Sequence, residues 1–260
     1  MTRLFLAAAD TPAGRAVSEG LAGSGFDIAT DSPDTDPVAA MREADVLVLV
    51  SPLEETLVRQ GFDLVNAAKE AGIGHVVRIS LYASANDAHW RLGRELGRVD
   101  LAVEESGLPY TILRPSMLMQ TLPTPAELNG VLRIPSGDAA VSYLDGRDLA
   151  ACVEAVLSDK EAHNGRTYAV TGPQGLSMDD LVQTMGEVSD KLPNAEALEE
   201  NDYLAVLSEQ GFDEWSRNML LSLSRIAKRG MAGNVTGAVR HITGRDPHSY
   251  ADYLASLEPE

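Results

Sequence analysis

The chain alternates short apolar runs with longer segments of helical periodicity, and this alternation constrains the fold more than any other feature. Between the runs, apolar residues recur at helical spacing, as in 55–72, which ends at Gly72. Strands that alternate with helices form parallel sheets with right-handed crossovers. We therefore predict an α/β fold with a Rossmann-like, doubly wound parallel sheet. The predicted strands are RLFLAAA (3–9), FDIAT (26–30), ADVLVLVS (44–51), HVVRIS (75–80) and PYTILRPS (109–116).

Beyond Met117 the alternation is less regular. Residues 139–159 are typical of a strand or loop that enters a helix, and 165–188 of a strand, a turn and a helix. From Pro193 onward the pattern is mostly helical. We predict two parts on this basis. A Rossmann-like domain covers 1–120 and is extended by 139–172, and a small, mostly helical C-terminal α/β substrate lobe covers 173–260.

The charge balance limits the partners of the chain. Its 39 acidic and 21 basic residues give a formal net charge of −18 at pH 7. So acidic a surface repels nucleic acid and anionic lipid. We therefore expect a small-molecule ligand, no nucleic-acid partner and no membrane partner, and we leave a homodimer open.

The remaining compositional signals are bland. The single cysteine, Cys152, lies in the apolar stretch LAACVEAVL, which favours a core position over a catalytic thiol. The histidines lack metal-ligand spacing, so we predict no metal site. The sequence enters its first strand without a signal peptide and has no long apolar span, so we expect a cytoplasmic protein.

Five stretches carry a family resemblance: GHVVRIS (74–80), RVDLAVEESGLPYTILRPSMLMQ (98–120), SYLDGRDLAACVEAVLSD (142–159), GRTYAVTGPQGLSMDDLVQTMGEVSDK (165–191) and YADYLASL (250–257). In this order they resemble the NmrA-like atypical short-chain dehydrogenases, and most of all their quinone-reductase-like bacterial branch. The resemblance implies a substrate cleft between the two lobes, at the carboxyl ends of the strands. Many members reduce quinones or related carbonyl compounds with NAD(P)H, whereas others sense the redox state of the nucleotide.

The phosphate-binding turn departs from the family pattern T-G-x-T-G-x-x-G-R. The sequence AAADTPAGR keeps Gly14 and Arg15 but has Ala8 and Thr11 at the other two glycine positions. The second glycine lets the backbone approach a pyrophosphate, so a threonine side chain crowds that site, and Pro12 stiffens the turn. We predict a degenerate nucleotide-binding motif with a closed phosphate site. The alternative is a re-shaped turn that still binds.

The chain is also short after its second strand. Only residues 30–44 separate FDIA from ADVLVLVS, so the strand and helix that normally grip the adenosine half are missing or shortened. No Lys or Arg lies between Arg15 and Arg42 to hold a 2′-phosphate, whereas Asp31 could accept a ribose 2′-hydroxyl and favour NAD over NADP. Alternatively, these aspartates solvate a turn and cap the next helix. If a nucleotide binds, we expect contacts from Thr11, Gly14, Arg15, Asp31 and Ser51.

Candidate catalytic groups follow the fourth strand. No tyrosine has a lysine four residues later, so the Tyr-x-x-x-Lys dyad of many short-chain dehydrogenases, in which the lysine lowers the tyrosine pKa, is absent. The loop SLYASANDAHWRLGR (80–94) offers Tyr82, His89 and Ser80 as catalytic candidates. Alternatively, a lone histidine is structural, and Trp and Met side chains at such positions only pack. The predicted substrate-binding residues are Trp90, Arg94, Met117, Met119 and Tyr143.

Three functions remain open from the sequence. The first is an enzyme or a binding protein that has lost NAD(P) binding, uses no cofactor, and binds or transforms a planar aromatic or quinone-like metabolite by non-redox chemistry. The second is an NAD(P)H-dependent quinone or carbonyl oxidoreductase, and the third is a non-enzymatic regulatory or interaction protein of the NmrA type. We favour the first, because the lost glycines and the shortened adenosine side point the same way.

Overall fold

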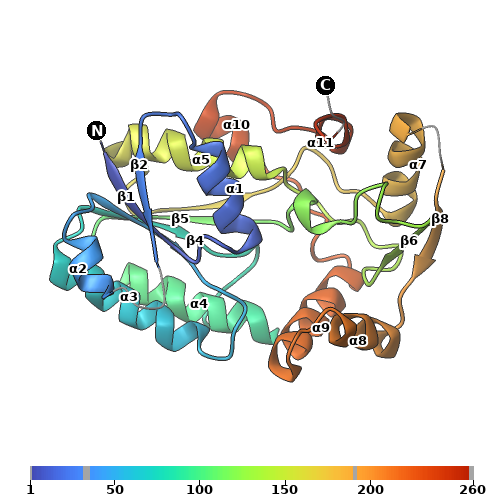
Figure 1. Ribbon diagram of the computed structural model, residues 1–260, viewed down its shortest axis with the longest axis horizontal. Helices are drawn as coiled ribbons and strands as arrows, with labels where there is room; N and C mark the ends of the chain where they lie inside the picture. The colour runs from blue at the N-terminus through green and yellow to red at the C-terminus, as the bar shows by residue number, and fades with distance from the viewer. Residues whose placement is uncertain (1, 32–35, 190–191, 258–260) are drawn as a thin grey trace.

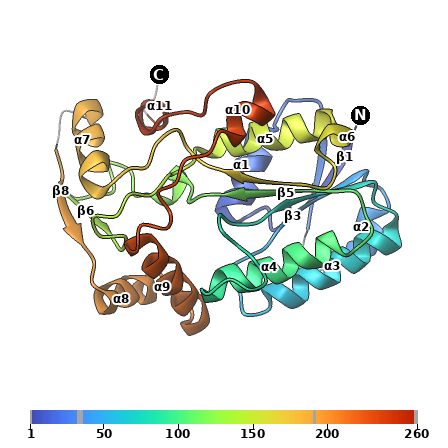
Figure 2. The ribbon, with the colours of Figure 1, turned by 180° about the vertical axis from the view of Figure 1, so that it is seen from behind.

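The computed structural model describes residues 2–31, 36–189 and 192–257. Its central sheet has six parallel strands in the order β2-β1-β3-β4-β5-β7, and helices cover both faces (Figures 1 and 2). The strands of this sheet are β1 (Arg3–Ala7), β2 (Asp27–Thr30), β3 (Val46–Val50), β4 (His75–Ile79), β5 (Tyr110–Pro115) and β7 (Arg166–Val170). The fold is thus the predicted Rossmann-like α/β fold.

Helices α1 (Pro12–Gly20), α5 (Gly146–Ser158) and α10 (Ala238–Thr243) cover one face of the sheet. The opposite face is covered by α2 (Pro37–Met41), α3 (Leu57–Ala71) and α4 (Arg91–Glu104), and the short α6 (Lys160–His163) leads from α5 to β7. Because both faces are covered, β3 and β4 are buried at every position. This double cover explains their unbroken hydrophobicity in the sequence.

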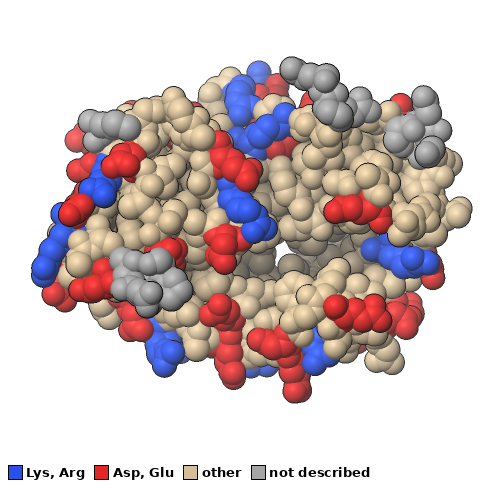
Figure 3. Space-filling view, in the orientation of Figure 1, with Lys and Arg blue, Asp and Glu red and all other residues tan. Residues whose placement is uncertain are grey.

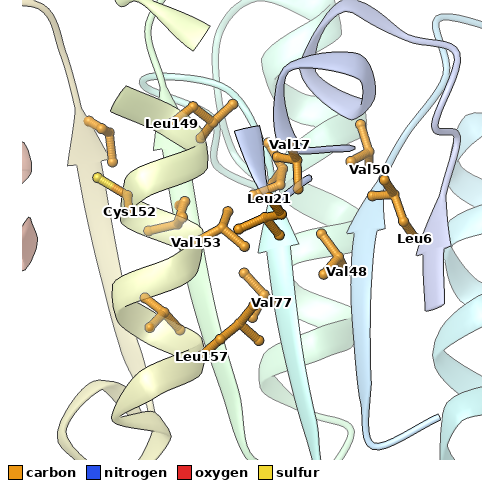
Figure 4. Close-up of a cluster of buried hydrophobic side chains, with 14 of the residues drawn as sticks. Leu6, Val17, Leu21, Val48, Val50, Val77, Leu149, Cys152, Val153 and Leu157 are labelled. Atoms are coloured by element: carbon orange, nitrogen blue, oxygen red, sulfur yellow. The ribbon is translucent and has the colours of Figure 1, made fainter. Parts of the chain in front are cut away.

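The core between the sheet and α1 and α5 consists mainly of aliphatic side chains (Figure 4). Cys152 of α5 lies in it, fully buried, and burial raises the pKa of its thiol to about 12. The prediction that Cys152 is a core residue is therefore confirmed. The labelled members of this core are Leu6, Val17, Leu21, Val48, Val50, Val77, Leu149, Cys152, Val153 and Leu157.

The central sheet ends at β2 on one side. A dinucleotide-binding sheet usually carries one more strand outside this position, in the order 3-2-1-4-5-6. Among the described residues no strand pairs with the outer edge of β2, and only the five-residue helix α2 lies between β2 and β3. The shortening predicted after the second strand is therefore present.

A second lobe lies beyond the carboxyl ends of the central strands (Figures 1 and 2). Its two parallel strands are β6 (Val131–Ile134) and β8 (Asn194–Ala197). Its helices are η1 (Met119–Thr121), α7 (Met178–Ser189), α8 (Glu200–Glu209), α9 (Glu214–Lys228) and α11 (Tyr250–Ala255). Although α10 lies within the stretch 173–260, it packs on α5 and β7 of the first lobe. Over the described residues, every helix is too short or too polar to cross a lipid bilayer.

Candidate functional site

A cleft of about 1010 Å³ lies between the two lobes, and Figure 3 shows it as a hollow near the middle of the visible face. Its floor is formed by the carboxyl ends of β3, β4 and β5, where parallel sheets bind ligands. One end reaches Thr11–Ala13, at the start of α1. The other end is enclosed by residues of β6, α8 and α9. The cleft thus joins the helix that would receive a pyrophosphate to a chamber in the second lobe.

The cleft walls are mainly apolar, and Glu127 and Arg133 are the charged side chains among the described residues that line it. Arg133 is paired with Glu196 at 2.8 Å between Nε and Oε2. Glu127 accepts hydrogen bonds from the amide and the hydroxyl of Thr124, which lower its pKa. Since both charges already have partners, the chamber suits an uncharged ligand.

At the end of the cleft near α1, the turn between β1 and α1 has a left-handed residue that is an alanine and not a glycine. Ala8 has a φ of 54°, in the left-handed region, and its amide donates to the Asp31 carboxylate at 3.0 and 3.1 Å. Gly14 is still required, because a Cβ there would lie 2.2 Å from the Ala8 carbonyl oxygen. The turn therefore keeps a left-handed conformation at Ala8 and still requires a glycine at Gly14.

The donors of this turn are largely used within the turn itself. The Thr11 hydroxyl donates to the Ala8 carbonyl at 2.8 Å and accepts from the Gly14 amide at 3.1 Å. Pro12 has no N–H, and the Arg15 guanidinium donates to the Asp10 carbonyl. Among the described residues, nothing accepts a hydrogen bond from the Ala13 amide, which lies at the cleft. At the cleft, a pyrophosphate would therefore meet one open amide, and the amides of Ala9 and Asp10, which also lack an acceptor among the described residues, lie outside the cleft lining.

Beneath the floor lies a buried network of charges. Asp100 accepts from Arg78 Nε at 3.1 Å and from Arg114 Nε at 3.0 Å. Asp100 and Arg78 are essentially inaccessible to solvent. Burial lowers the pKa of Arg78, and the Asp100 carboxylate opposes that shift. One carboxylate thus balances two guanidinium groups.

Two serines connect this network to the cleft. Ser80 donates to Asp100 Oδ2 at 2.9 Å, and Ser51 accepts from Arg78 Nη1 at 2.9 Å. Both serines line the cleft. Since Ser51 already accepts a charge-assisted hydrogen bond, its own hydroxyl proton is available to a ligand.

The structure brings some of the predicted site residues together. Ser51, Ser80, Met117, Tyr143 and Thr11 line the cleft, and Gly14, Arg15 and Asp31 shape the adjoining turn. Met119 is fully buried among the apolar side chains of the second lobe.

The residues predicted from 82–94 lie outside the residues that line the cleft. After Tyr82 the chain turns at Ala83, with a φ of 58°, and runs into α4. Trp90 packs in the core against Gly93, His89 is exposed, and Arg94 donates to the Ala88 carbonyl at 3.0 Å. Catalytic or substrate-binding roles for Tyr82, His89, Trp90 and Arg94 stay predictions.

Several residues of the site were not found from the sequence. Arg78 and Asp100 had a signal, because each is a charged residue inside an apolar strand or helix face. Ser136, Tyr203, Leu207 and Phe212 of the second lobe had none, since no motif marks them. Their place at the cleft depends on how the second lobe folds over the sheet.

Comparison with known sequences gives a consistent family. The NmrA-like family matches residues 21–233. An NAD(P)H azoreductase of Xenophilus azovorans is 30% identical over 218 residues, covering 83% of this chain and 76% of that protein. A (4-alkanoyl-5-oxo-2,5-dihydrofuran-3-yl)methyl phosphate reductase of Streptomyces griseus is 30% identical over 222 residues, covering 83% and 77%.

Comparison with solved structures agrees on the fold. An NADPH-dependent quinone oxidoreductase of Escherichia coli, in complex with NADPH, superposes with a TM-score of 0.82. The two are 23% identical, over 98% of this chain and 99% of that one. The named reductases among these relatives fit the second of the three functions above better than the first.

Proposed function

The chain belongs to the NmrA-like family, and from this premise we propose that it is an NAD(P)H-dependent reductase of flat, uncharged aromatic or quinone-like compounds. The observation that carries the proposal is the single cleft that runs from the start of α1 across the ends of β3, β4 and β5 into an apolar chamber. Such a cleft can hold a nucleotide and a planar acceptor side by side. The relatives described as NAD(P)H and NADPH enzymes support the same cofactor.

The nucleotide end fits a dinucleotide in part. The left-handed backbone of Ala8, the close approach at Gly14 and the open amide of Ala13 favour a phosphate at this helix start. We expect Asp31, which directly follows β2, to accept a ribose hydroxyl. An exposed carboxylate there repels a 2′-phosphate, so we expect NADH to bind more tightly than NADPH.

In this reaction a bound NAD(P)H supplies a hydride. The chain's own residues position the acceptor and exclude water from it, with the Ser51 hydroxyl available as a hydrogen-bond donor at the floor. A quinone that accepts a hydride becomes a hydroquinone anion, which takes its proton from water once it has left the cleft. The absence of a Tyr-x-x-x-Lys dyad is compatible with that chemistry.

A second candidate is a protein that binds the same ligands without a nucleotide. It is favoured by one observation, the turn at Thr11 and Pro12, which leaves a pyrophosphate a single open amide within the cleft lining. The regulatory function has no particular observation in its favour.

Calorimetric titration of the purified protein with NADH and, separately, NADPH tests the proposal. We expect binding at micromolar affinity, tighter for NADH, followed by nucleotide-dependent reduction of a quinone. The matched variant Asp31→Asn keeps an acceptor for the Ala8 amide but removes the charge, and it is expected to narrow the preference for NADH. A folded protein that shows no heat with millimolar nucleotide would overturn the proposal and favour the second candidate.

A further inference from the structure

Among the described residues of the second lobe, five that bear a hydroxyl group line the cleft. Thr121 and Ser224 donate to backbone carbonyls, which leaves the hydroxyls of Ser136, Tyr143 and Tyr203. Ser136 follows β6, Tyr143 precedes α5, and Tyr203 belongs to α8. Ser136 and Tyr143 are 4% and 2% exposed, and Tyr203 is half-buried. Segments far apart in the sequence therefore bring polar groups to one end of an apolar cleft.

In the described part of the chain, the Tyr143 hydroxyl has Ser136 as its hydrogen-bonding neighbour, and the Tyr203 hydroxyl forms no hydrogen bond. The Ser136 Oγ is buried and unpaired. The Ser136 hydroxyl lies near the Tyr143 phenol and lowers its pKa, against the larger effect of burial, but the pair lacks ordinary hydrogen-bond geometry. Buried polar groups without partners are rare in folded proteins and call for a specific explanation.

The two phenols are neutral donors. Burial raises the pKa of Tyr143 and raises that of Tyr203 to about 12, so both keep their protons at physiological pH. The side chains around them are apolar, among them Leu128, Ile134 and Leu207. Such surroundings favour a neutral acceptor atom, because a charged ligand would lose its hydration without a counter-charge.

We propose that Ser136, Tyr143 and Tyr203 form a subsite, here named the hydroxyl subsite, that holds the carbonyl or quinone oxygen of a flat, uncharged ligand. The hydroxyls donate to the ligand oxygen, and the apolar walls contact its ring system. This proposal extends the proposed function, because it names the oxygen atom of the ligand that the protein recognises. It does not depend on nucleotide binding.

The test compares 9-fluorenone with fluorene, two flat molecules of nearly the same shape in which a carbonyl replaces a methylene. Their dissociation constants are measured by equilibrium dialysis without nucleotide, for the unmodified protein and for Ser136→Ala, Tyr143→Phe and Tyr203→Phe. We expect each variant to lose about threefold to tenfold in affinity for fluorenone, while fluorene binding changes less than twofold. Tyr110→Phe, at the start of β5 and outside the cleft lining, is the matched control and is expected to change neither.

Ser136→Ala carries a second readout. Removing a buried hydroxyl that has no partner should raise the melting temperature of the ligand-free protein by about 2–4 °C. A serine with a merely structural hydrogen bond would lower it instead. Gain of stability together with loss of fluorenone affinity is the expected pair of results.

The proposal is overturned if the unmodified protein binds neither compound, or if the ratio of the two affinities is the same in every variant. Because no nucleotide is present in the dialysis, a protein that fails to bind NADH can still show the hydroxyl subsite. Conversely, if the protein reduces quinones while the ratio of fluorenone to fluorene affinity is the same in every variant, the result supports the proposed function and contradicts the hydroxyl subsite.

Discussion

Under the cleft, the single carboxylate of Asp100 balances the positive charges of two arginines. Asp100→Asn leaves two guanidinium groups, from Arg78 and Arg114, without a counter-charge. We expect that change to lower the free energy of unfolding by about 3–5 kcal/mol in urea denaturation. Arg78→Met should cost clearly less, because Asp100 keeps Arg114 and an unpaired buried Nη2 disappears. Equal losses in the two variants would contradict this account.

His75 makes stability depend on pH. Its Nε2 lies 3.0 Å from the Thr111 hydroxyl. Because that hydroxyl itself donates to the His163 carbonyl, His75 is the donor in the bond between His75 and Thr111. Burial lowers its pKa to about 4, against about 6.5 in the unfolded chain. Between these values only the unfolded state takes up the proton, so stability falls as the pH drops from about 6.5 to 4.

The size of this effect is about 3 kcal/mol at most, since the unfolded state gains the protonation energy over that window. Urea denaturation of the unmodified protein and of His75→Gln at several pH values measures it. Gln can still donate to Thr111 but does not take up a proton in this pH range. We therefore expect the variant to lose less stability than the unmodified protein on acidification. Parallel pH profiles would show that other groups are responsible.

Sequence reasoning placed the residues that directly end a strand and missed those that depend on loop shape. Ser80 and Met117 reach the cleft because they follow β4 and β5, and parallel strands end at one edge. Trp90 and His89 do not line it, because the turn at Ala83 and the contact of Trp90 with Gly93 carry that loop away. Neither the turn nor the contact has a signature in the linear pattern.

The turn between β1 and α1 is the element on which nucleotide affinity depends. Restoring its glycines with the double variant Ala8→Gly/Thr11→Gly opens the phosphate side and frees the Gly14 amide. We expect NADH to bind about tenfold more tightly, equivalent to about 1.4 kcal/mol, by calorimetric titration. Losing the Thr11 cap to glycine should cost only a few tenths of a kcal/mol in stability.

The single variant Ala8→Gly is the control for that experiment. It relieves the left-handed strain of Ala8 without removing the Thr11 side chain, so we expect its NADH affinity to stay unchanged. If the double variant gains no affinity over this control, the crowding by Thr11 is not what limits binding.

The five strands 3–9, 26–30, 44–51, 75–80 and 109–116 and the long helices of the first lobe could be predicted, because each strand is a short apolar run and each helix has a helical period. β8 could not, since its sequence NAEA is exposed and has weak strand preference. It is a strand because its backbone pairs with β6, far away in the chain, and Arg133 bonds Glu196 across the pair. The strand structure of the second lobe therefore depends on pairing between distant segments. For the same reason, the residues that this lobe contributes to the cleft could not be predicted from the sequence.

The net charge of −18 acts on the whole molecule and on every anionic ligand that approaches it. Figure 3 shows acidic side chains spread over the visible face, and the Arg15 guanidinium near the turn is engaged by a backbone carbonyl. Raising the ionic strength from about 0.01 to about 0.1 M shortens the Debye length from about 30 to about 10 Å, which screens this repulsion. We therefore expect NADH and NADPH to associate faster as salt is added, and NADPH to gain more because it carries a further phosphate.

Stopped-flow fluorescence of the nucleotide measures these rates. An uncharged ligand such as 9-fluorenone is the internal control, since its affinity should change little over the same range of salt. Slower association at higher salt would contradict the expectation and would mean that a local cation, such as Arg15 released from Asp10, governs the approach. The sign of the salt effect thus tells whether the overall charge or the helix entrance controls the access of the nucleotide.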